Sequence, residues 1–153
     1  MPTEANGQRK PALLLVEDNP ADVRLAQEVL RMSGFEHTLL VARDGEQALS
    51  VLRRGPGFEQ RPWPSLVLLD LNLPRRDGRE VLREVKEDPK LRRIPVLVLS
   101  TSKAESDVAA CYEAHANCYL TKPVDIVEFG RLVELIRDFW FGLAQLPSPV
   151  EEA

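Results

Sequence analysis

The sequence predicts an α/β fold, a doubly wound and mostly parallel sheet of five strands accompanied by five helices. Five short apolar runs alternate with amphipathic segments along the chain. The strongest runs are continuously apolar, which is typical of strands buried on both faces, as in parallel sheets. One strand–helix rhythm continues from residue 12 to residue 143. Right-handed crossovers would therefore connect parallel strands.

The first strand covers residues 12–16 and is followed by helix-start signals. Asn19 can cap a helix, Pro20 suits its first position, and Gly34 suits its end. A second strand is predicted at residues 37–42. The remaining elements are, in order, a helix around Ala48, Leu49 and Leu52, a Gly- and Pro-rich loop at 55–64, a strand at 65–69 ending at Asp70, a helix with Val81, Leu82 and Val85, a strand at 95–99 ending at Ser100, a helix at 107–115, a strand at 117–120 and a helix at 125–143.

Composition excludes several classes of protein. A chain of 153 residues suits one domain, and residues 1–10 are expected to form a disordered tail. The formal charge is −4 and no basic stripe is present, so we expect no direct nucleic-acid binding. No apolar run reaches the about 18 residues of a membrane span, and the N-terminus lacks a signal segment. Cys111 and Cys118 show no metal-ligand spacing, which indicates reduced thiols and a cytoplasmic protein.

Polar residues follow the predicted strands at one end. Glu17 and Asp18 come after the first strand, Asp70 after the third, Ser100 after the fourth and Lys122 after the fifth. Doubly wound sheets place their sites just beyond the carboxyl ends of the strands. Taken singly, these residues would be ordinary helix-start acids, turn residues and a surface lysine. Their joint occurrence at four strand ends favours a functional site.

Three carboxylates at one sheet edge predict a cation site. Like charges this close repel each other unless a cation lies among them. Mg²⁺ (or Mn²⁺) prefers such hard oxygen ligands and keeps waters. We expect Asp18 and Asp70 to bind the ion directly, Glu17 to act through water, and the backbone carbonyl of Asn72 to supply a further oxygen.

The same residues suit phosphoryl transfer. A carboxylate can attack phosphorus and form an acyl phosphate, and the protein then supplies positioning and charge neutralisation. Asp70 ends the central strand, so it is the expected nucleophile. Lys122 would neutralise the phosphoryl oxygens. The hydroxyl of Ser100 could turn toward a new phosphoryl oxygen.

At these residues the sequence resembles the response-regulator receiver family of two-component signalling, from about Ala12 to Ile136. The matching motifs are Leu-Val-Glu-Asp-Asn at 15–19, Leu-Leu-Asp-Leu-Asn-Leu-Pro-Arg-Arg-Asp-Gly at 68–78, Val-Leu-Ser at 98–100 and Tyr-Leu-Thr-Lys-Pro at 119–123. The resemblance implies a flavodoxin-like receiver domain over residues 11–138 with strand order 2-1-3-4-5. It also implies phosphotransfer from a sensor histidine kinase to Asp70, with Ser100 and Tyr119 as switch residues that alter a partner-binding face. The protein would be a phosphoacceptor and not an enzyme.

A closer likeness is to the small response regulators paired with bacterial and cyanobacterial phytochromes. It rests on residues 115–123, on the insertion before Ser65 and on the tail from Asp138 to Pro147. It implies a bacteriophytochrome as kinase partner and a C-terminal extension at residues 139–153. His115 stands where glycine is frequent in the family, and we expect it to end a helix in the left-handed conformation.

The apolar residues of the tail predict a homodimer. Val127, Leu132, Leu135 and Ile136 can serve the domain's own core. Phe139, Trp140, Phe141, Leu143 and Leu146 continue beyond it and would form an exposed patch, which is typical of an interface. The alternative is that the tail folds back on its own domain.

Other functions fit less well. A phosphatase of the haloacid-dehalogenase type needs a second acid where Asn72 stands, and a flavin binder would meet repulsion of its phosphate at Glu17 and Asp18. A DNA-binding regulator would need an output domain beyond the last helix. Within the receiver interpretation, an effector that binds a still unknown target and a phosphorelay intermediate both remain open.

Overall fold

A five-stranded parallel sheet forms the centre of the computed structural model, which describes residues 10–55, 57, 59, 62–74 and 76–147. The strand order is β2-β1-β3-β4-β5. The predicted fold class, strand order and five α-helices are confirmed, and a short π-helix, η1, is added at the end. The elements are, in order, β1 (Ala12–Val16), α1 (Pro20–Met32), β2 (Thr38–Ala42), α2 (Gly45–Leu52), β3 (Leu66–Asp70), α3 (Gly78–Glu87), β4 (Val96–Ser100), α4 (Glu105–Glu113), β5 (Cys118–Thr121), α5 (Ile126–Asp138) and η1 (Phe139–Leu143).

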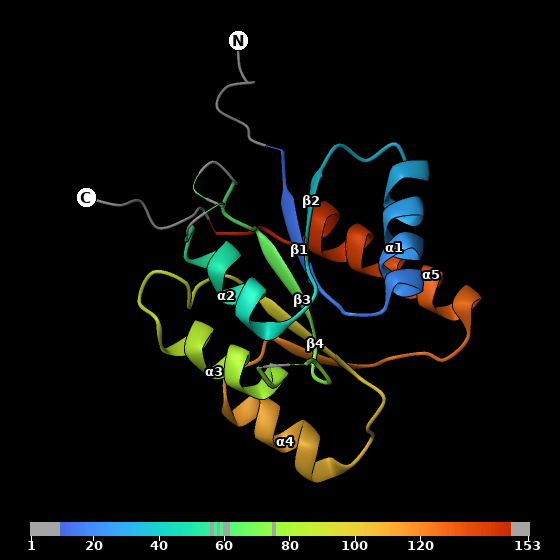
Figure 1. The fold of residues 1–153 in the computed structure, drawn as a ribbon. Helices are drawn as coiled ribbons and strands as arrows, with labels where there is room; N and C mark the ends of the chain where they lie inside the picture. Colours follow the sequence, from blue (N-terminus) through green and yellow to red (C-terminus); the bar gives the residue numbers. More distant parts are fainter. Residues whose placement is uncertain (1–9, 56, 58, 60–61, 75, 148–153) are drawn as a thin grey trace.

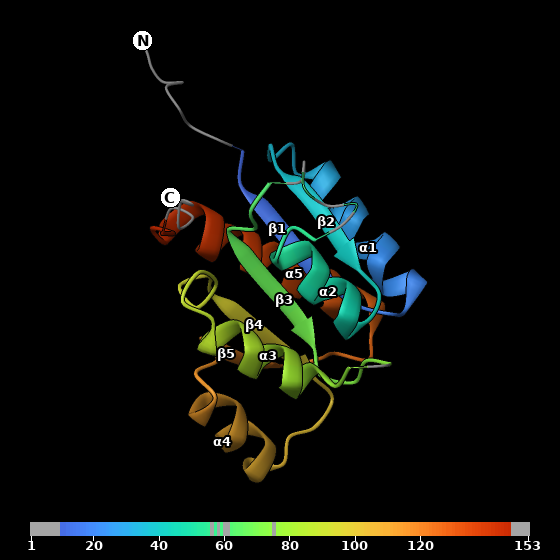
Figure 2. The ribbon, with the colours of Figure 1, turned by 60° about the vertical axis from the view of Figure 1, so that its left-hand side comes forward.

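Helices cover both faces of the sheet. Figures 1 and 2 show α1 and α5 side by side on one face, with α2, α3 and α4 on the other. Successive residues of each central strand point to opposite faces. Leu14 and Leu69 accordingly lie in the core under α2 and α3, whereas Leu13 and Leu68 lie in the core under α1 and α5. This double burial is why β1, β3 and β4 are continuously apolar in sequence.

Polar side chains cap the N-termini of four of the five α-helices. Each cap residue accepts hydrogen bonds from backbone N–H groups of the first turn, which otherwise have no partner in the helix. The caps are Asn19, Asp44, Asp77 and Asp125. The exception is α4, where Ala104 makes no side-chain cap bond. At the other end of α4, His115 has φ 75°, as predicted for a residue in the left-handed conformation.

Two predicted helices differ in extent from the structure. The fourth helix begins at Glu105 instead of Asp107, because acidic residues suit the first turn and extend it toward the N-terminus. The last predicted helix changes from α to π at Phe139. Of the predicted disordered tail at residues 1–10, only Lys10 lies within the described residues, and the loop at 55–64 is described only in part.

Candidate functional site

The predicted polar residues meet at the carboxyl edge of the sheet. Glu17 and Asp18 follow β1, which lies beside β3, and Asp70 is the last residue of β3. One carboxylate oxygen from each of these three residues lies within 4.8 Å of the others. Glu17 and Asp70 are 1% and 5% exposed, whereas Asp18 is exposed. The cluster is therefore buried at Glu17 and Asp70 and open to solvent at Asp18.

Lys122 lies against this cluster from the loop after β5. Its Nζ is 2.8 Å from Glu17 Oε1 and 3.1 Å from Asp70 Oδ2. A third acid, Asp22 in the first turn of α1, lies 3.0 Å from the same nitrogen. Burial by itself would lower the pKa of Lys122, but the bonds from Glu17 and Asp22 and the charges around it outweigh burial and raise that pKa. The ammonium group is therefore held in its charged form.

Backbone N–H groups hold the other oxygens of the two buried carboxylates. The N–H of Asn19 donates to Glu17 Oε2 at 3.1 Å, and that of Asn72 donates to Asp70 Oδ1 at 2.9 Å. Each buried carboxylate thus has one oxygen on Lys122 and one on the backbone two residues later. Burial raises the pKa of Glu17, with the Lys122 hydrogen bond opposing and the Asp70 charge adding to this effect.

The donor set suits a hard divalent cation. Four carboxylates, those of Glu17, Asp18, Asp22 and Asp70, gather at a single ammonium group, that of Lys122. This leaves an excess of negative charge. Oxygen ligands with room for waters are the environment that Mg²⁺ prefers in proteins, and Mn²⁺ accepts similar ligands. The residues present therefore fit the predicted metal.

The two predicted switch residues share a neighbour in the loop after β4. Ser100 is 3% exposed, and its Oγ accepts a hydrogen bond from the N–H of Ser102 at 3.1 Å. Tyr119 is half-buried, and its hydroxyl donates to the carbonyl of Ser102 at 2.8 Å. Both contacts therefore fix the loop that leads into α4.

Asp22 and Ser102 were not predicted as site residues. Asp22 could have been predicted from its position three residues after the cap Asn19. An acid in the first turn of a helix that directly follows a strand lies close to the carboxyl edge of the sheet. No comparable sequence signal existed for Ser102, because its role depends on a tertiary contact with Tyr119.

The C-terminal residues only partly match the predicted interface. Phe139 and Leu143 are 51% and 77% exposed, as expected for the predicted patch. Trp140 and Phe141 instead pack against the core under α1 and α5, and Leu146 is half-buried. The predicted exposure is thus confirmed for Phe139 and Leu143, and the alternative of a tail that folds back holds for Trp140 and Phe141.

The predicted inward face of α5 is also partly wrong. Val127 and Leu135 are 74% and 53% exposed, whereas Ile136 is buried and Leu132 half-buried. The buried residues of the helix are Phe129, Val133 and Ile136. These three residues lie four and three positions apart on one face of the helix, whereas the prediction combined apolar residues from both faces.

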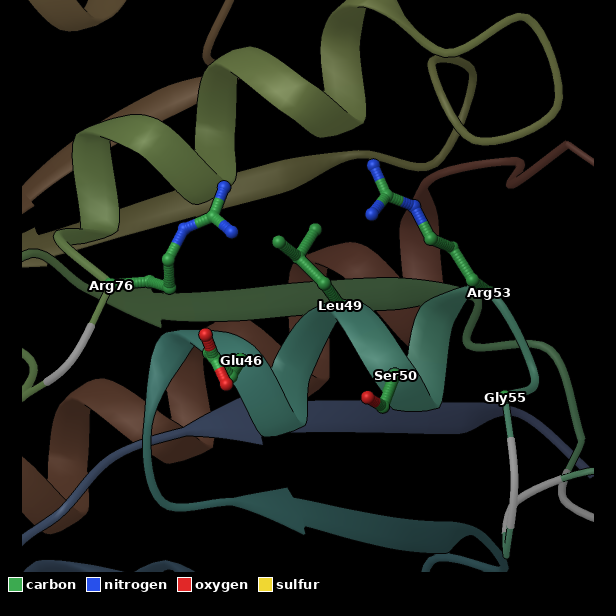
Figure 3. A pocket seen from close by; sticks show the side chains of 6 residues that line it. All are labelled: Glu46, Leu49, Ser50, Arg53, Gly55 and Arg76. Atoms are coloured by element: carbon green, nitrogen blue, oxygen red, sulfur yellow. The ribbon is translucent and has the colours of Figure 1, made fainter.

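A hollow between α2 and α3 is distinct from this site. Figure 3 shows Arg53 and Arg76 on its rim, both pointing toward α3, with Leu49 between them. Both guanidinium groups pair with Glu84, Arg53 at 2.9 Å, and Arg76 also lies 3.5 Å from Glu80. Because these charges are matched within the protein, the hollow offers no obvious anion site.

A doubly wound sheet with carboxylates and a lysine at its carboxyl edge defines a phosphoacceptor domain of two-component signalling. Residues 13–136 match the response regulator receiver domain, and the chain belongs to this family. Response regulator Rcp1 of Synechocystis sp. is 51% identical over 136 residues, which cover 89% of this chain and 92% of that protein.

Solved structures give the same relationship. The phosphorylated cyanobacterial phytochrome response regulator RcpA is 47% identical with a TM-score of 0.87, and the match covers 92% of this chain and all of that one (100%). The Mn²⁺-bound form of response regulator Rcp1 is 50% identical with a TM-score of 0.85, over 90% of this chain and 99% of that one. Within the described residues, no helix has the length and apolar character needed to cross a membrane.

Proposed function

We propose that Asp70 accepts a phosphoryl group from a phosphohistidine of a sensor kinase. An Asp70 carboxylate oxygen forms the new bond to phosphorus while the phosphorus–nitrogen bond to the kinase histidine breaks, and the released imidazole takes a proton. The single observation that carries this proposal is the position of Asp70 at a sheet edge, with Oδ2 3.1 Å from Lys122 and Glu17 and Asp18 beside it.

The neighbouring residues have separate roles in this proposal. Lys122 lies where its ammonium group can neutralise phosphoryl oxygens. Asp18 and Asp70 would hold Mg²⁺ or Mn²⁺, with Glu17 acting through water and the Asn72 carbonyl as a further ligand. The bound ion would neutralise charge that develops on the transferred group.

A change at Ser100 and Tyr119 would turn phosphorylation into a signal. The acyl phosphate would carry about −1.5 to −2 charges where the Asp70 carboxylate carried −1, and this added charge would act on Ser100. Its hydroxyl would turn toward the phosphoryl oxygen, and the Tyr119 ring would reorient. Both residues contact the loop before α4, so the face made by α4, β5 and α5 would change.

Two partners complete the proposal. Similarity to Rcp1 and to the phytochrome response regulator RcpA supports a phytochrome-type kinase as phosphodonor in the cytoplasm. Exposed Leu135, Phe139 and Leu143 recur every four residues and support a homodimer in which the extension at 139–153 takes part. The output is either binding of an effector target or onward transfer in a phosphorelay.

Labelling with a radioactive kinase tests the assignment. Wild-type protein should gain label only with a divalent cation, and the label should be lost in mild alkali, as expected for an acyl phosphate. Asp70→Asn should remain unlabelled, whereas Asp138→Asn, at an exposed acid remote in sequence, should label normally. Alkali-labile label on Asp70→Asn would contradict the proposal.

A further inference from the structure

Each N–H group of the Lys122 ammonium can be assigned a carboxylate acceptor. The Nζ atom lies 2.8 Å from Glu17 Oε1, 3.0 Å from Asp22 Oδ2 and 3.1 Å from Asp70 Oδ2. An ammonium group has three N–H donors, so these three acids account for all of them. A phosphoryl oxygen that binds Lys122 must therefore take the place of one of these acceptors.

Asp22 differs from the other two acids in its position in the fold. Glu17 and Asp70 lie at strand ends and are buried, whereas Asp22 lies in the first turn of α1 and its side chain is 22% exposed. Among the described residues, the three carboxylates whose oxygens lie within 4.8 Å of one another do not include that of Asp22. Asp22 therefore acts on the site through Lys122 and not as an expected ligand of the metal ion.

The start of α1 fixes the place of the Asp22 carboxylate. The Asn19 side chain accepts hydrogen bonds from the N–H groups of Ala21 at 2.9 Å and Asp22 at 3.3 Å. Glu17 in turn accepts a hydrogen bond from the N–H of Asn19 at 3.1 Å. The segment from Glu17 to Asp22 is thus held by its own hydrogen bonds, and the carboxylates at its two ends meet at one ammonium group.

The charge of Asp22 reduces what Lys122 can offer to an anion. Burial would lower the pKa of Lys122, but its hydrogen bonds to Glu17 and, next, to Asp22 outweigh burial. When a phosphoryl oxygen replaces the Asp70 acceptor, Glu17 and Asp22 remain bonded to the same nitrogen. The phosphoryl oxygen then lies within about 6 Å of the Asp22 carboxylate, a distance at which two negative charges in a partly buried site repel each other.

We propose that Asp22 is a positioning residue that holds Lys122 in the unphosphorylated state and competes with the phosphoryl group for the charge of that lysine. This inference rests on the proposed phosphorylation of Asp70. The competing carboxylate raises the free energy of the phosphorylated form relative to the unphosphorylated form. Asp22 therefore shifts the equilibrium of phosphotransfer toward the unphosphorylated protein.

This role predicts opposite effects on the binding of an anion and of a cation. Asp22→Asn removes the negative charge but keeps the size of the side chain and an oxygen that accepts a hydrogen bond. At saturating Mg²⁺, the variant should bind beryllium fluoride, a mimic of the phosphoryl group, about tenfold more tightly, because Lys122 no longer shares its charge with Asp22. It should bind Mg²⁺ alone about threefold more weakly, because one negative charge near the cation is lost.

Two titrations of the full chain measure these affinities. Calorimetry gives the dissociation constant for Mg²⁺ alone, and fluorine NMR gives that for beryllium fluoride at saturating Mg²⁺. A loss of structure would weaken the binding of both ions, so opposite changes identify an effect of charge. Unchanged or weaker binding of beryllium fluoride by a folded Asp22→Asn would overturn the proposal. Asp22→Ser also removes the charge and provides the same test if Asp22→Asn does not fold.

Glu28→Gln is the matched control on the same helix. Glu28 is an exposed acid of α1 that pairs with Arg31 at 2.6 Å, so the variant loses the same charge away from Lys122. Both affinities of Glu28→Gln should stay within about twofold of wild type, since solvent screens this charge. Asp22→Glu keeps the charge and should also remain close to wild type. An equal gain of beryllium fluoride affinity in Glu28→Gln would overturn the specific role of Asp22.

The two proposals fail in different ways. Asp70→Asn should abolish the fluorine signal of the bound mimic. A wild-type protein that does not bind the mimic would contradict the phosphoacceptor assignment. A wild-type protein that binds it no more weakly than Asp22→Asn does would contradict the role of Asp22 alone.

Discussion

At the residue scale, the site is defined by the hydrogen-bond partner of each carboxylate oxygen. Lys122 and two backbone N–H groups occupy all four oxygens of Glu17 and Asp70. Asp18, exposed and beside them, is the acid most accessible to an incoming ion. Metal binding would therefore begin at Asp18 and draw Asp70 partly from Lys122.

Asp18→Ala should weaken Mg²⁺ binding by about tenfold or more, because one of the two carboxylates expected to bind the ion directly is lost. Wild-type affinity should lie in the low-millimolar range, roughly, since the site is open and keeps waters. Calorimetric titration measures both values. Asp138→Asn is the matched control, and equal affinity of Asp18→Ala and wild type would refute the ligand assignment.

Gly78 is a residue at which the loop after the phosphoacceptor leaves no room for a side chain. An added Cβ would lie 2.6 Å from Leu71 Cα and 2.7 Å from the Asp70 carbonyl oxygen. Gly78→Ala should therefore displace the backbone beside Asp70 and destabilise the protein by about 2 kcal/mol. Urea unfolding measures the loss. Gly142→Ala, where a Cβ meets nothing within 4 Å, should change stability little, and equal effects of the two variants would contradict this explanation.

Asp107 gives a pH dependence with a defined sign. The hydrogen bond from Ser102, with help from Arg79, lowers its folded pKa below the ordinary 3.8. Such a group contributes stability that is present above pH 3.8 and is lost as pH falls through the folded pKa. The stability difference between wild type and Asp107→Asn should thus shrink on acidification below 3.8, as followed by urea unfolding. A difference that grows in acid would be inconsistent with this sign, and Glu105→Gln controls for charge removal.

At the element scale, the sequence predicted the strands and most helices well for a simple reason. Apolar runs such as residues 12–16 and 96–99 are buried on both faces, so their pattern does not depend on what packs against them. Helix caps such as Asn19 depend only on residues close in the sequence, so they were equally predictable. The face of α5 was less predictable, because both of its sides carry apolar residues and only tertiary packing decides between Val127 and Phe129.

The residues of the candidate site also differ in how well the sequence predicted them. Glu17, Asp70 and Lys122 follow strands, and strand ends meet by topology alone, so their meeting was predictable. Asp22 and Ser102 reach the site through a helical turn and a loop, and their positions depend on contacts that local patterns do not encode.

Lys86 ties the end of α3 to the segment before β4. Its ammonium donates to the carbonyls of Arg92 at 2.9 Å and Ile94 at 2.8 Å. Lys86→Met keeps the aliphatic stem but removes both hydrogen bonds, and should lower the free energy of unfolding by about 1 kcal/mol. Thermal and urea unfolding measure this, with exposed Lys103→Met as control. No difference between the two variants would show that these bonds add nothing net.

At the scale of the whole molecule, the two faces of the sheet have different exteriors. The face under α1 and α5 continues into η1, where Trp140 and Phe141 extend the core and Phe141 lies 5.3 Å from the ring of Phe35. The same helical path leaves Leu135, Phe139 and Leu143 outside. The extension therefore both closes the domain's core and presents an apolar stripe.

This stripe should mediate a homodimer. Leu135, Phe139 and Leu143 are 53%, 51% and 77% exposed and recur at one-turn spacing, so they form one continuous row on α5 and η1. Twofold packing of such rows would bury all six side chains, and large apolar side chains dominate interface energies. Phe139→Ser with Leu143→Glu should thus raise the dimer dissociation constant by at least about tenfold, while Trp140 and Phe141 stay in the core.

Sedimentation over a dilution series measures this dissociation constant, with Met32→Ser, 76% exposed on α1, as the matched control. A wild-type chain that remains monomeric at about 100 µM, far above the micromolar affinities of weak interfaces, would exclude the dimer, and equal dimerisation of the double variant would move the interface elsewhere.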